Sequence, residues 1–202
     1  MKILYALTAA ALLAGMLTGC GQNETESIAE ENLPYGATLI TDTEKGEVPI
    51  TYDRRFFDAD EIQTLSSYFY ALESQNVELL EETTLDLYID FIVDAMYQGL
   101  AGTDGLLTEM NAKFAVEENV PYTIQDVEIT AFYTVEDNAN TDLENLYNML
   151  QELSGDENYL QRINGGKYLT YTIQTQSDDQ TKTFMDQTLF LIQVDGVYVV
   201  CS

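Results

Sequence analysis

Hydrophobic side chains in the first half of the chain recur at the spacing of an α-helix. The first stripe consists of Ile62, Leu65, Phe69 and Leu72, which lie three or four residues apart. Asp58 and Glu61 precede it in the pattern of a capping box, which marks a helix start. The same spacing predicts a second helical region over residues 77–98 and a third over residues 104–119. The core stripe of the second consists of Leu85, Tyr88, Ile89, Ile92, Ala95 and Met96.

In the second half the period changes from helical to alternating. Alternation predicts one strand over residues 127–135, and residues 168–176 and 183–194 are expected to form two more. Asp195-Gly196 is a tight-turn sequence, and it leads into a last strand over residues 197–201.

A single helix is expected between these strands. Thr141 and Glu144 repeat the capping-box pattern, and Gly155 stands where the apolar spacing stops. Its stripe consists of Leu143, Leu146, Tyr147, Leu150 and Leu153. Helices followed by a mostly antiparallel sheet define an α+β fold class.

The first twenty residues have the pattern of an export signal. Lys2 is followed by an uncharged run to Met16, shorter than the roughly 20 residues of a membrane-spanning helix. The run leads into Leu17-Thr18-Gly19-Cys20, which resembles the lipobox of bacterial lipoproteins. The resemblance implies that residues 1–19 are removed as a signal peptide. It also implies that lipid on Cys20 anchors the chain to the extracytoplasmic face of the cell membrane. The alternative is an ordinary secretory signal with an incidental cysteine.

Two regions are expected beyond the signal. Residues 20–55, punctuated by prolines and glycines, are expected to form a flexible tether and an extended segment. Residues 56–202 are long enough for one domain with its own core. Their element order and the closing pattern over residues 188–200 resemble the NTF2-like (cystatin-like) α+β family. In that family a curved sheet wraps around a helix, and the helix around residues 143–153 departs from the pattern.

The charge of the chain excludes several partners. It has 35 acidic and 8 basic residues, with a net charge of −27 at neutral pH. Such a field repels nucleic acid and anionic lipid, and it attracts cations and basic protein surfaces. A solvated surface on an exposed protein is the simpler explanation.

Residue types needed for common catalytic sites are scarce. Histidine, the commonest general base and zinc ligand, is absent. Once Cys20 is lipidated, Cys201 is the remaining thiol, so neither an intramolecular disulfide nor a thiolate metal cluster can form. Cys201 closes an apolar strand and is expected to be a buried structural thiol. The sequence therefore assigns no catalytic residue, no metal and no cofactor.

Tyrosines and acids are abundant enough to meet in a pocket. Isomerases and dehydratases of the resembled fold combine a base with a tyrosine or a protonated carboxyl. The tyrosines considered are Tyr68, Tyr70, Tyr88, Tyr122, Tyr133, Tyr168, Tyr171 and Tyr198. Asp86, Asp90 and Asp94 share one helix face, which is expected to face solvent.

Two polar segments have structural explanations that compete with functional ones. Residues 137–144 carry oxygen ligands at alternating positions, but they lack the glycine and the final glutamate of an EF-hand loop. An acidic turn is expected there. Arg54 and Arg55 could bind an anionic group, but we expect them to pair with nearby carboxylates. The neighbouring aromatics are expected to dock the tether on the domain.

These features predict a membrane-anchored extracytoplasmic lipoprotein that acts as a non-enzymatic binding or interaction module. Its ligand is an unknown small molecule or an envelope protein. The alternatives are an isomerase-like or dehydratase-like enzyme and a structural or homodimerising envelope protein. An enclosed pocket with a carboxyl beside a tyrosine would favour the enzyme. A filled core with an exposed apolar sheet face would favour the dimer.

Overall fold

The computed structural model describes residues 39–40, 48–97, 102–117, 120–136 and 141–202. The strands are β1 (Leu39–Ile40), β2 (Ile50–Tyr52), β3 (Thr123–Tyr133), β4 (Ile163–Ser177), β5 (Gln180–Val194) and β6 (Val197–Cys201). The helices are α2 (Ala59–Ser74), α3 (Val77–Thr83), α4 (Asp86–Tyr97), α5 (Gly102–Lys113), α6 (Asp142–Ser154) and the short 3-10 helix η2 (Tyr159–Arg162). The chain is therefore an α+β protein, as predicted. Cys20, the expected signal and residues 137–140 lie outside the described residues.

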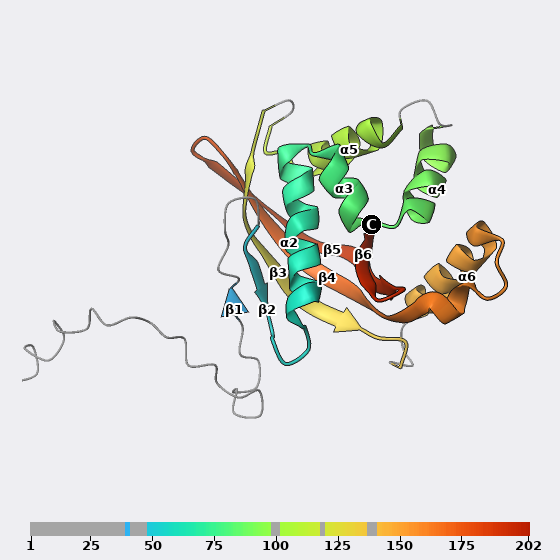
Figure 1. Cartoon of the computed structure of the whole chain (residues 1–202). Coiled ribbons are helices and arrows are strands. Elements are labelled where there is room, and N and C mark those ends of the chain that lie inside the picture. Colours follow the sequence, from blue (N-terminus) through green and yellow to red (C-terminus); the bar gives the residue numbers. More distant parts are fainter. Residues whose placement is uncertain (1–38, 41–47, 98–101, 118–119, 137–140) are drawn as a thin grey trace, which may run out of the picture. The chain divides into compact units, whose positions relative to one another are not determined.

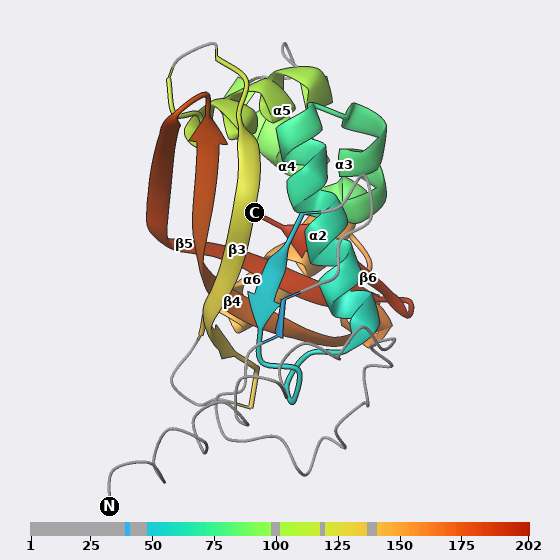
Figure 2. The same cartoon turned by 90° about the vertical axis from the view of Figure 1, so that its left-hand side faces the viewer.

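The six strands form one open sheet in the order β1-β2-β3-β4-β5-β6. Its pairings are antiparallel except that of β2 with β3, which is parallel. The long strands β4 and β5 bend, and helices α2 to α5 lie on one side of the sheet (Figures 1 and 2). A register shift between Tyr171 and Ile173 interrupts the β4–β5 ladder, as a β-bulge does where a strand bends. No helix in the described ranges is long and apolar enough to cross a membrane.

The side chains of strand β4 alternate between an inner and an outer face of the sheet. Leu169, Tyr171 and Ile173 are buried in the core cluster that also contains residues of α2. Thr170 and Thr172, which alternate with them, are only partly buried, and Gln174 is exposed. Because side chains alternate across a strand, this polar row lies on the outer face of β4.

Helix α2 is the central helix on the inner face, and it starts where the sequence predicts. The Glu61 backbone N–H donates to Asp58 Oδ1 at 2.9 Å, and the Asp58 N–H donates to Glu61 Oε2 at 3.0 Å. This reciprocal pair confirms the expected capping box. The predicted apolar stripe, Ile62, Leu65, Phe69 and Leu72, is buried.

The prediction of one helical region over residues 77–98 is wrong, because the helix is interrupted between α3 and α4. Thr84 has extended backbone angles and forms a β-bridge with Val200 of β6. Its hydroxyl donates to the Leu80 carbonyl at 2.5 Å, which completes the end of α3. Of the expected stripe, Ile89 is buried but Ala95 is exposed, and Val93, which was not part of that stripe, is buried. Helix α5 ends at Lys113, six residues before the predicted end.

Helix α6 forms as predicted, but without its expected cap. Thr141 occupies the N-cap in a helical conformation and makes no side-chain capping bond. A capping residue normally needs extended angles to turn its oxygen toward the first helical N–H groups, so the predicted capping box is wrong. Gly155 ends the helix with a left-handed φ of 64°, as expected.

Strand β6 lies between two hydrophobic clusters. Val200 belongs to the cluster under α2, α3 and α5. Val199 and Cys201, on the opposite face of the strand, belong to a second cluster that includes the apolar side of α6. Cys201 is fully buried, and burial raises the pKa of its thiol well above the usual range. The expectation of a buried structural thiol is confirmed.

The segment before residue 56 contributes to this fold. Val48 and Ile50 are buried in the first cluster. The Val48 N–H donates to Ser66 Oγ at 2.8 Å, and Ser66 Oγ donates back to the Val48 carbonyl at 2.7 Å. These bonds fix the start of β2 against α2.

Candidate functional site

A pocket of about 580 Å³ lies where the first turn of α2 meets the beginning of β4. We call it the corner pocket. It is open on one side rather than enclosed, and its walls come from α2, α6, the segment after β3, and strands β4 to β6. The lining residues that matter most are Glu61, Tyr147, Gly165, Gly166, Lys167 and Tyr198.

A buried ion pair forms one wall of the corner pocket. Lys167 Nζ donates to Glu61 Oε1, and only 15% of the lysine side chain and 7% of the glutamate side chain are exposed. The ammonium group also lies 4.6 Å from the centre of the Phe57 ring, within the range of a cation–π contact. Because Glu61 Oε2 accepts the Asp58 N–H, both oxygens of this buried carboxylate are satisfied.

Tyr198 of β6 extends the same network. Its hydroxyl donates to Asp58 Oδ2 at 3.0 Å. Burial, followed by the bond to this carboxylate, raises the pKa of Tyr198 well above its usual value. The hydroxyl therefore stays protonated at neutral pH. Asp58, Glu61, Lys167 and Tyr198 together join α2 to β4 and β6.

Tyr147 of α6 differs from these residues. Its hydroxyl oxygen is buried and has no hydrogen-bond partner among the described residues. Burial raises the pKa of Tyr147 to about 12, so the group is a neutral hydroxyl. The ring lies against the backbone of Gly166, where an added Cβ would come within 2.5 Å of the Tyr147 oxygen. Only glycine leaves room for this approach.

The floor of the corner pocket is an open strand edge. The ladder between β3 and β4 ends at the pair Tyr133–Tyr168, whereas β4 begins at Ile163. Residues 163–167 are paired with β5 on one side, and β3 supplies no partner for them on the other. At Gly165 an added Cβ would meet nothing within 4 Å. Among the described residues, this edge of β4 therefore has no partner strand beside the pocket.

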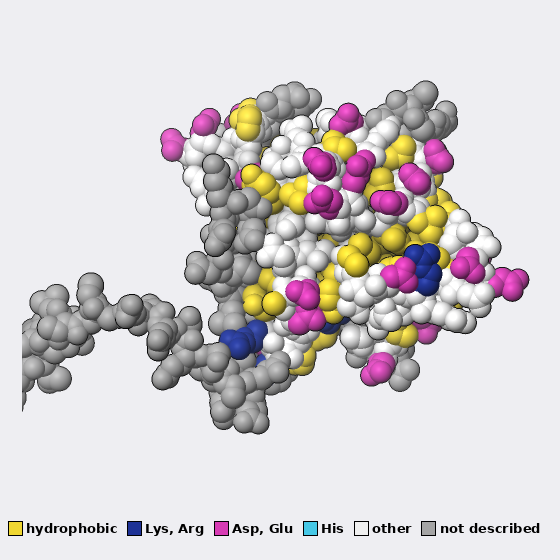
Figure 3. Space-filling view, viewed as in Figure 1, with side chains coloured by type: hydrophobic (Ala, Val, Ile, Leu, Met, Phe, Trp, Pro, Cys, Tyr) yellow, Lys and Arg dark blue, Asp and Glu magenta, His cyan; other side chains and the backbone are white. Residues whose placement is uncertain are grey.

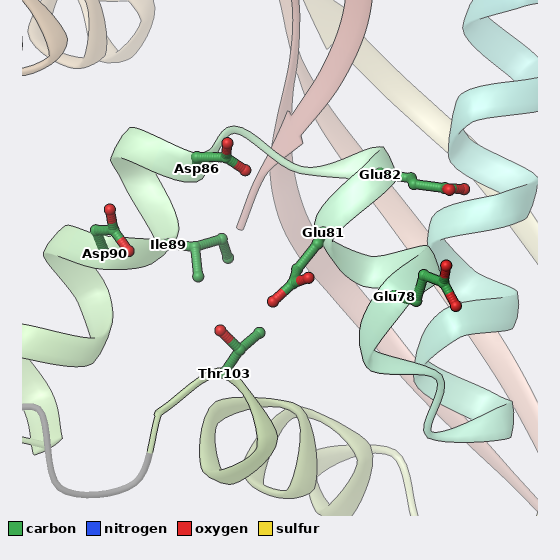
Figure 4. Close-up of a pocket in the computed structure, with 7 residues that line it drawn as sticks. All are labelled: Glu78, Glu81, Glu82, Asp86, Ile89, Asp90 and Thr103. Atoms are coloured by element: carbon green, nitrogen blue, oxygen red, sulfur yellow. The ribbon is translucent and has the colours of Figure 1, made fainter.

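A second hollow, of about 510 Å³, lies among α3, α4 and α5. We call it the acidic groove. Its carboxylates belong to Glu78, Glu81, Glu82, Asp86 and Asp90. In Figure 4, Glu81 points toward Thr103 and Ile89, while Glu78 and Glu82 lie apart from Asp86 and Asp90. Acidic side chains gather over α3 and α4 in Figure 3. Within the described ranges no group of three or more acidic or cysteine side chains is placed to hold a metal ion.

Several residues considered in the sequence have structural roles. Asp86, Asp90 and Asp94 are exposed, as expected. Arg55 pairs with Asp53, with Nε 2.9 Å from Oδ1, and this partner lowers the pKa of Asp53. Phe56 and Phe57 pack on Phe132 of β3, with ring centres 5.2 and 5.3 Å apart.

Three of the other candidate tyrosines are core residues. Tyr68, Tyr122 and Tyr171 are buried in the core, and burial raises the pKa of each. Of the tyrosines considered, Tyr198 is the one that lines the corner pocket.

Sequence reasoning missed the other residues of the corner pocket. Glu61 was interpreted only as a capping residue, and Tyr147 only as part of an apolar stripe. Gly165-Gly166-Lys167 lies before the expected strand, because two glycines carry no alternating pattern. The one signal in the sequence is that Lys167 directly follows two glycines, in a chain with only 8 basic residues.

Comparison with protein-family models, with curated proteins and with solved structures finds no match. The function of the site is therefore argued from its geometry.

Proposed function

We propose that this chain is a lipid-anchored extracytoplasmic binding protein that holds a small polar ligand in its corner pocket. The observation that carries the proposal is the Tyr147 hydroxyl, which is buried without a partner in the described part of the chain. A buried polar group left unsatisfied costs about 1–3 kcal/mol. A ligand that accepts or donates a hydrogen bond there recovers this cost, so the pocket favours a polar occupant over a purely apolar one.

The compensated charges in the lining of the same pocket support the same proposal. Glu61 and Lys167 hold each other in place, and Tyr198 is fixed by Asp58. Their side chains are ordered before a ligand arrives, which reduces the entropy that binding must overcome. This arrangement favours recognition of a ligand with both hydrogen-bonding and charged groups.

The same bonds argue against the enzymatic alternative. A general base must take up a proton from the substrate, and for Glu61 this would mean giving up its ion pair with Lys167. Both Glu61 oxygens already accept hydrogen bonds, one of them from the Lys167 ammonium. The pocket is also open, whereas catalysis by this kind of site benefits from excluding water. We therefore propose binding without chemistry.

The structural alternative needs an apolar face through which two copies pair. On the outer face of β4, Thr170, Thr172 and Gln174 give little apolar area for such pairing, and Tyr168 on that face packs against Tyr133 and Phe190 of its own chain. This polar composition supports a monomeric binding module.

Anchoring and fold family complete the proposal. The lipobox-like Leu17-Thr18-Gly19-Cys20 supports attachment through lipid on Cys20, with the following residues acting as the tether. An NTF2-like fold is supported by α2 lying on the inner face of a bent, mostly antiparallel sheet (Figure 2). Replacing Cys20→Ser should abolish palmitate incorporation and release the protein from the membrane fraction. Unchanged membrane retention would contradict the anchor.

The binding proposal is tested by removing a single oxygen atom. Tyr147→Phe should leave the ligand-free protein equally stable or slightly more stable, because it deletes an unsatisfied hydroxyl. Thermal shift is then measured against free amino acids, short peptides, sugars and organic acids at millimolar concentration. A ligand should stabilise the wild type and the control Tyr88→Phe, a partly buried tyrosine outside the pocket, and stabilise Tyr147→Phe less. Equal shifts in all three proteins would contradict the proposed site.

A further inference from the structure

The most informative feature of the corner pocket is the open edge of β4 on its floor. Strand edges with unpaired N–H and C=O groups bind other extended chains, and proteins normally cover or blunt them. Here the edge over residues 163–167 adjoins a cavity, and its centre consists of two glycines. No side chain at those two positions stands between a ligand backbone and the edge.

We propose that the corner pocket binds a short extended peptide as an added strand along this edge, with its C-terminal carboxylate at Lys167. The inference rests on the proposed binding function and specifies its ligand class. Binding by strand addition obtains affinity from main-chain hydrogen bonds. The five residues of the edge, at about 3.3 Å each, match a peptide of about four or five residues.

Lys167 determines which end of the peptide is recognised. It is the one basic residue in the pocket lining and stands at the end of the edge, next to Tyr168, where the pairing with β3 begins. An ammonium group has three donors, and Glu61 uses one of them. A carboxylate can accept another, whereas a neutral amide end cannot make the charge-assisted bond. The peptide amino group needs no special partner beside the acidic surface around it.

Tyr147 lies next to the same edge. Its hydroxyl approaches Gly166, at the middle of the edge, from the face of the sheet that α6 covers, so a bound peptide would meet this hydroxyl where it passes Gly166. The described walls of the acidic groove offer no comparable edge, because they are helices whose backbone groups are bonded internally. The geometry therefore points to the corner pocket as the peptide site.

The probe is tetra-alanine with free ends, titrated into the folded protein and followed by calorimetry and by amide NMR shifts of Gly165 and Gly166. We expect saturable binding in the millimolar range or tighter. C-terminal amidation should weaken binding at least about tenfold, and N-terminal acetylation by less than about threefold. Absence of binding by tetra-alanine, or equal loss from the two end modifications, overturns the proposal.

A second peptide series tests the strand geometry itself. Because successive N–H groups of a strand point to opposite sides, only alternate peptide donors can face β4. One peptide carries an N-methyl group at residue 3, and its partner carries them at residues 2 and 4. One of the two should bind like tetra-alanine and the other at least about tenfold more weakly. Equal affinities would mean that no strand is added.

The outcomes also separate this inference from the function on which it rests. If Tyr147→Phe weakens the binding of non-peptide ligands but tetra-alanine does not bind, the pocket is a binding site and the peptide assignment is wrong. If no compound depends on Tyr147, both proposals fail.

Discussion

The corner pocket and the acidic groove have similar volumes but opposite electrostatic organisation. The acidic groove, of about 510 Å³, collects five carboxylates on α3 and α4 and has no basic residue in its lining. The corner pocket, of about 580 Å³, pairs a buried carboxylate with the one lysine beside it. In a chain with a net charge of −27, carboxylates alone carry little information. A carboxylate that forms a buried ion pair with one of the 8 basic residues is the better sign of a specific site.

The difference predicts how strongly each region responds to mutation. Like charges exposed to water interact weakly because the solvent screens them. A buried charge that loses its partner remains desolvated, and that is costly. Changes in the corner pocket should therefore affect stability far more than changes in the acidic groove.

The largest effect is expected from Lys167→Met. This change leaves Glu61 charged and buried, and it should lower the free energy of unfolding by about 3–5 kcal/mol. Urea denaturation followed by circular dichroism measures it. The double variant Glu61→Gln/Lys167→Met should recover part of the loss, because it leaves no unpaired charge. Glu81→Gln in the acidic groove is the matched control and should change stability little. A comparable loss there would contradict the distinction.

A smaller loss is expected from Gly166→Ala. The new methyl group would come within 2.5 Å of the Tyr147 oxygen and 2.9 Å of Ile192 Cγ2, and overpacking of this kind costs about 1–3 kcal/mol. In the background of Tyr147→Phe the loss should shrink, since the nearest clashing atom is gone. Denaturant melts of the four proteins form a double-mutant cycle. Strict additivity would show that Tyr147 does not approach Gly166.

Acid should stabilise the fold through carboxylates that lie outside both hollows. Burial raises the pKa of Glu73, and of Asp126, above their usual values. The folded state then binds protons more readily than the unfolded chain, so stability rises as pH falls through the folded pKa toward the unfolded pKa. Glu73→Gln should reduce this gain, as measured by the melting temperature between pH 7 and pH 4. Asp53, whose pKa is lowered, acts in the opposite direction. An unchanged pH profile in Glu73→Gln would refute the assignment.

The smallest effect is expected in the acidic groove. Glu78 and Glu82 lie four residues apart on α3, where like charges destabilise a helix by about 0.2–0.5 kcal/mol. Glu82→Gln should stabilise the protein by that amount, and added salt should remove the difference. Glu144→Gln serves as a control of opposite sign, because Glu144 interacts favourably with the N-terminus of α6. A loss of stability in Glu82→Gln would indicate an unrecognised partner for that carboxylate.

The sequence predicted elements wherever the signal is local. The capping box of α2, the stripe of α6 and the Asp195-Gly196 turn depend on residues within a few positions of one another, and they are found as expected. The break at Thr84 was not predictable, because it depends on a bridge to Val200, more than a hundred residues away. The corner pocket was not predictable from the sequence for the same reason. Glu61 and Lys167 stand 106 residues apart, and only the fold brings them together.

The position of strand β6 affects how this protein unfolds. Its alternate side chains enter different hydrophobic clusters, Val200 on one face and Val199 with Cys201 on the other. Detaching the strand would expose both clusters at once, which couples the unfolding of one to that of the other. We therefore expect these two clusters to unfold in a single cooperative transition. With Cys20 absent from a soluble form, Cys201 is the one remaining thiol. Its rate of reaction with a thiol reagent would report directly how often that whole unit opens.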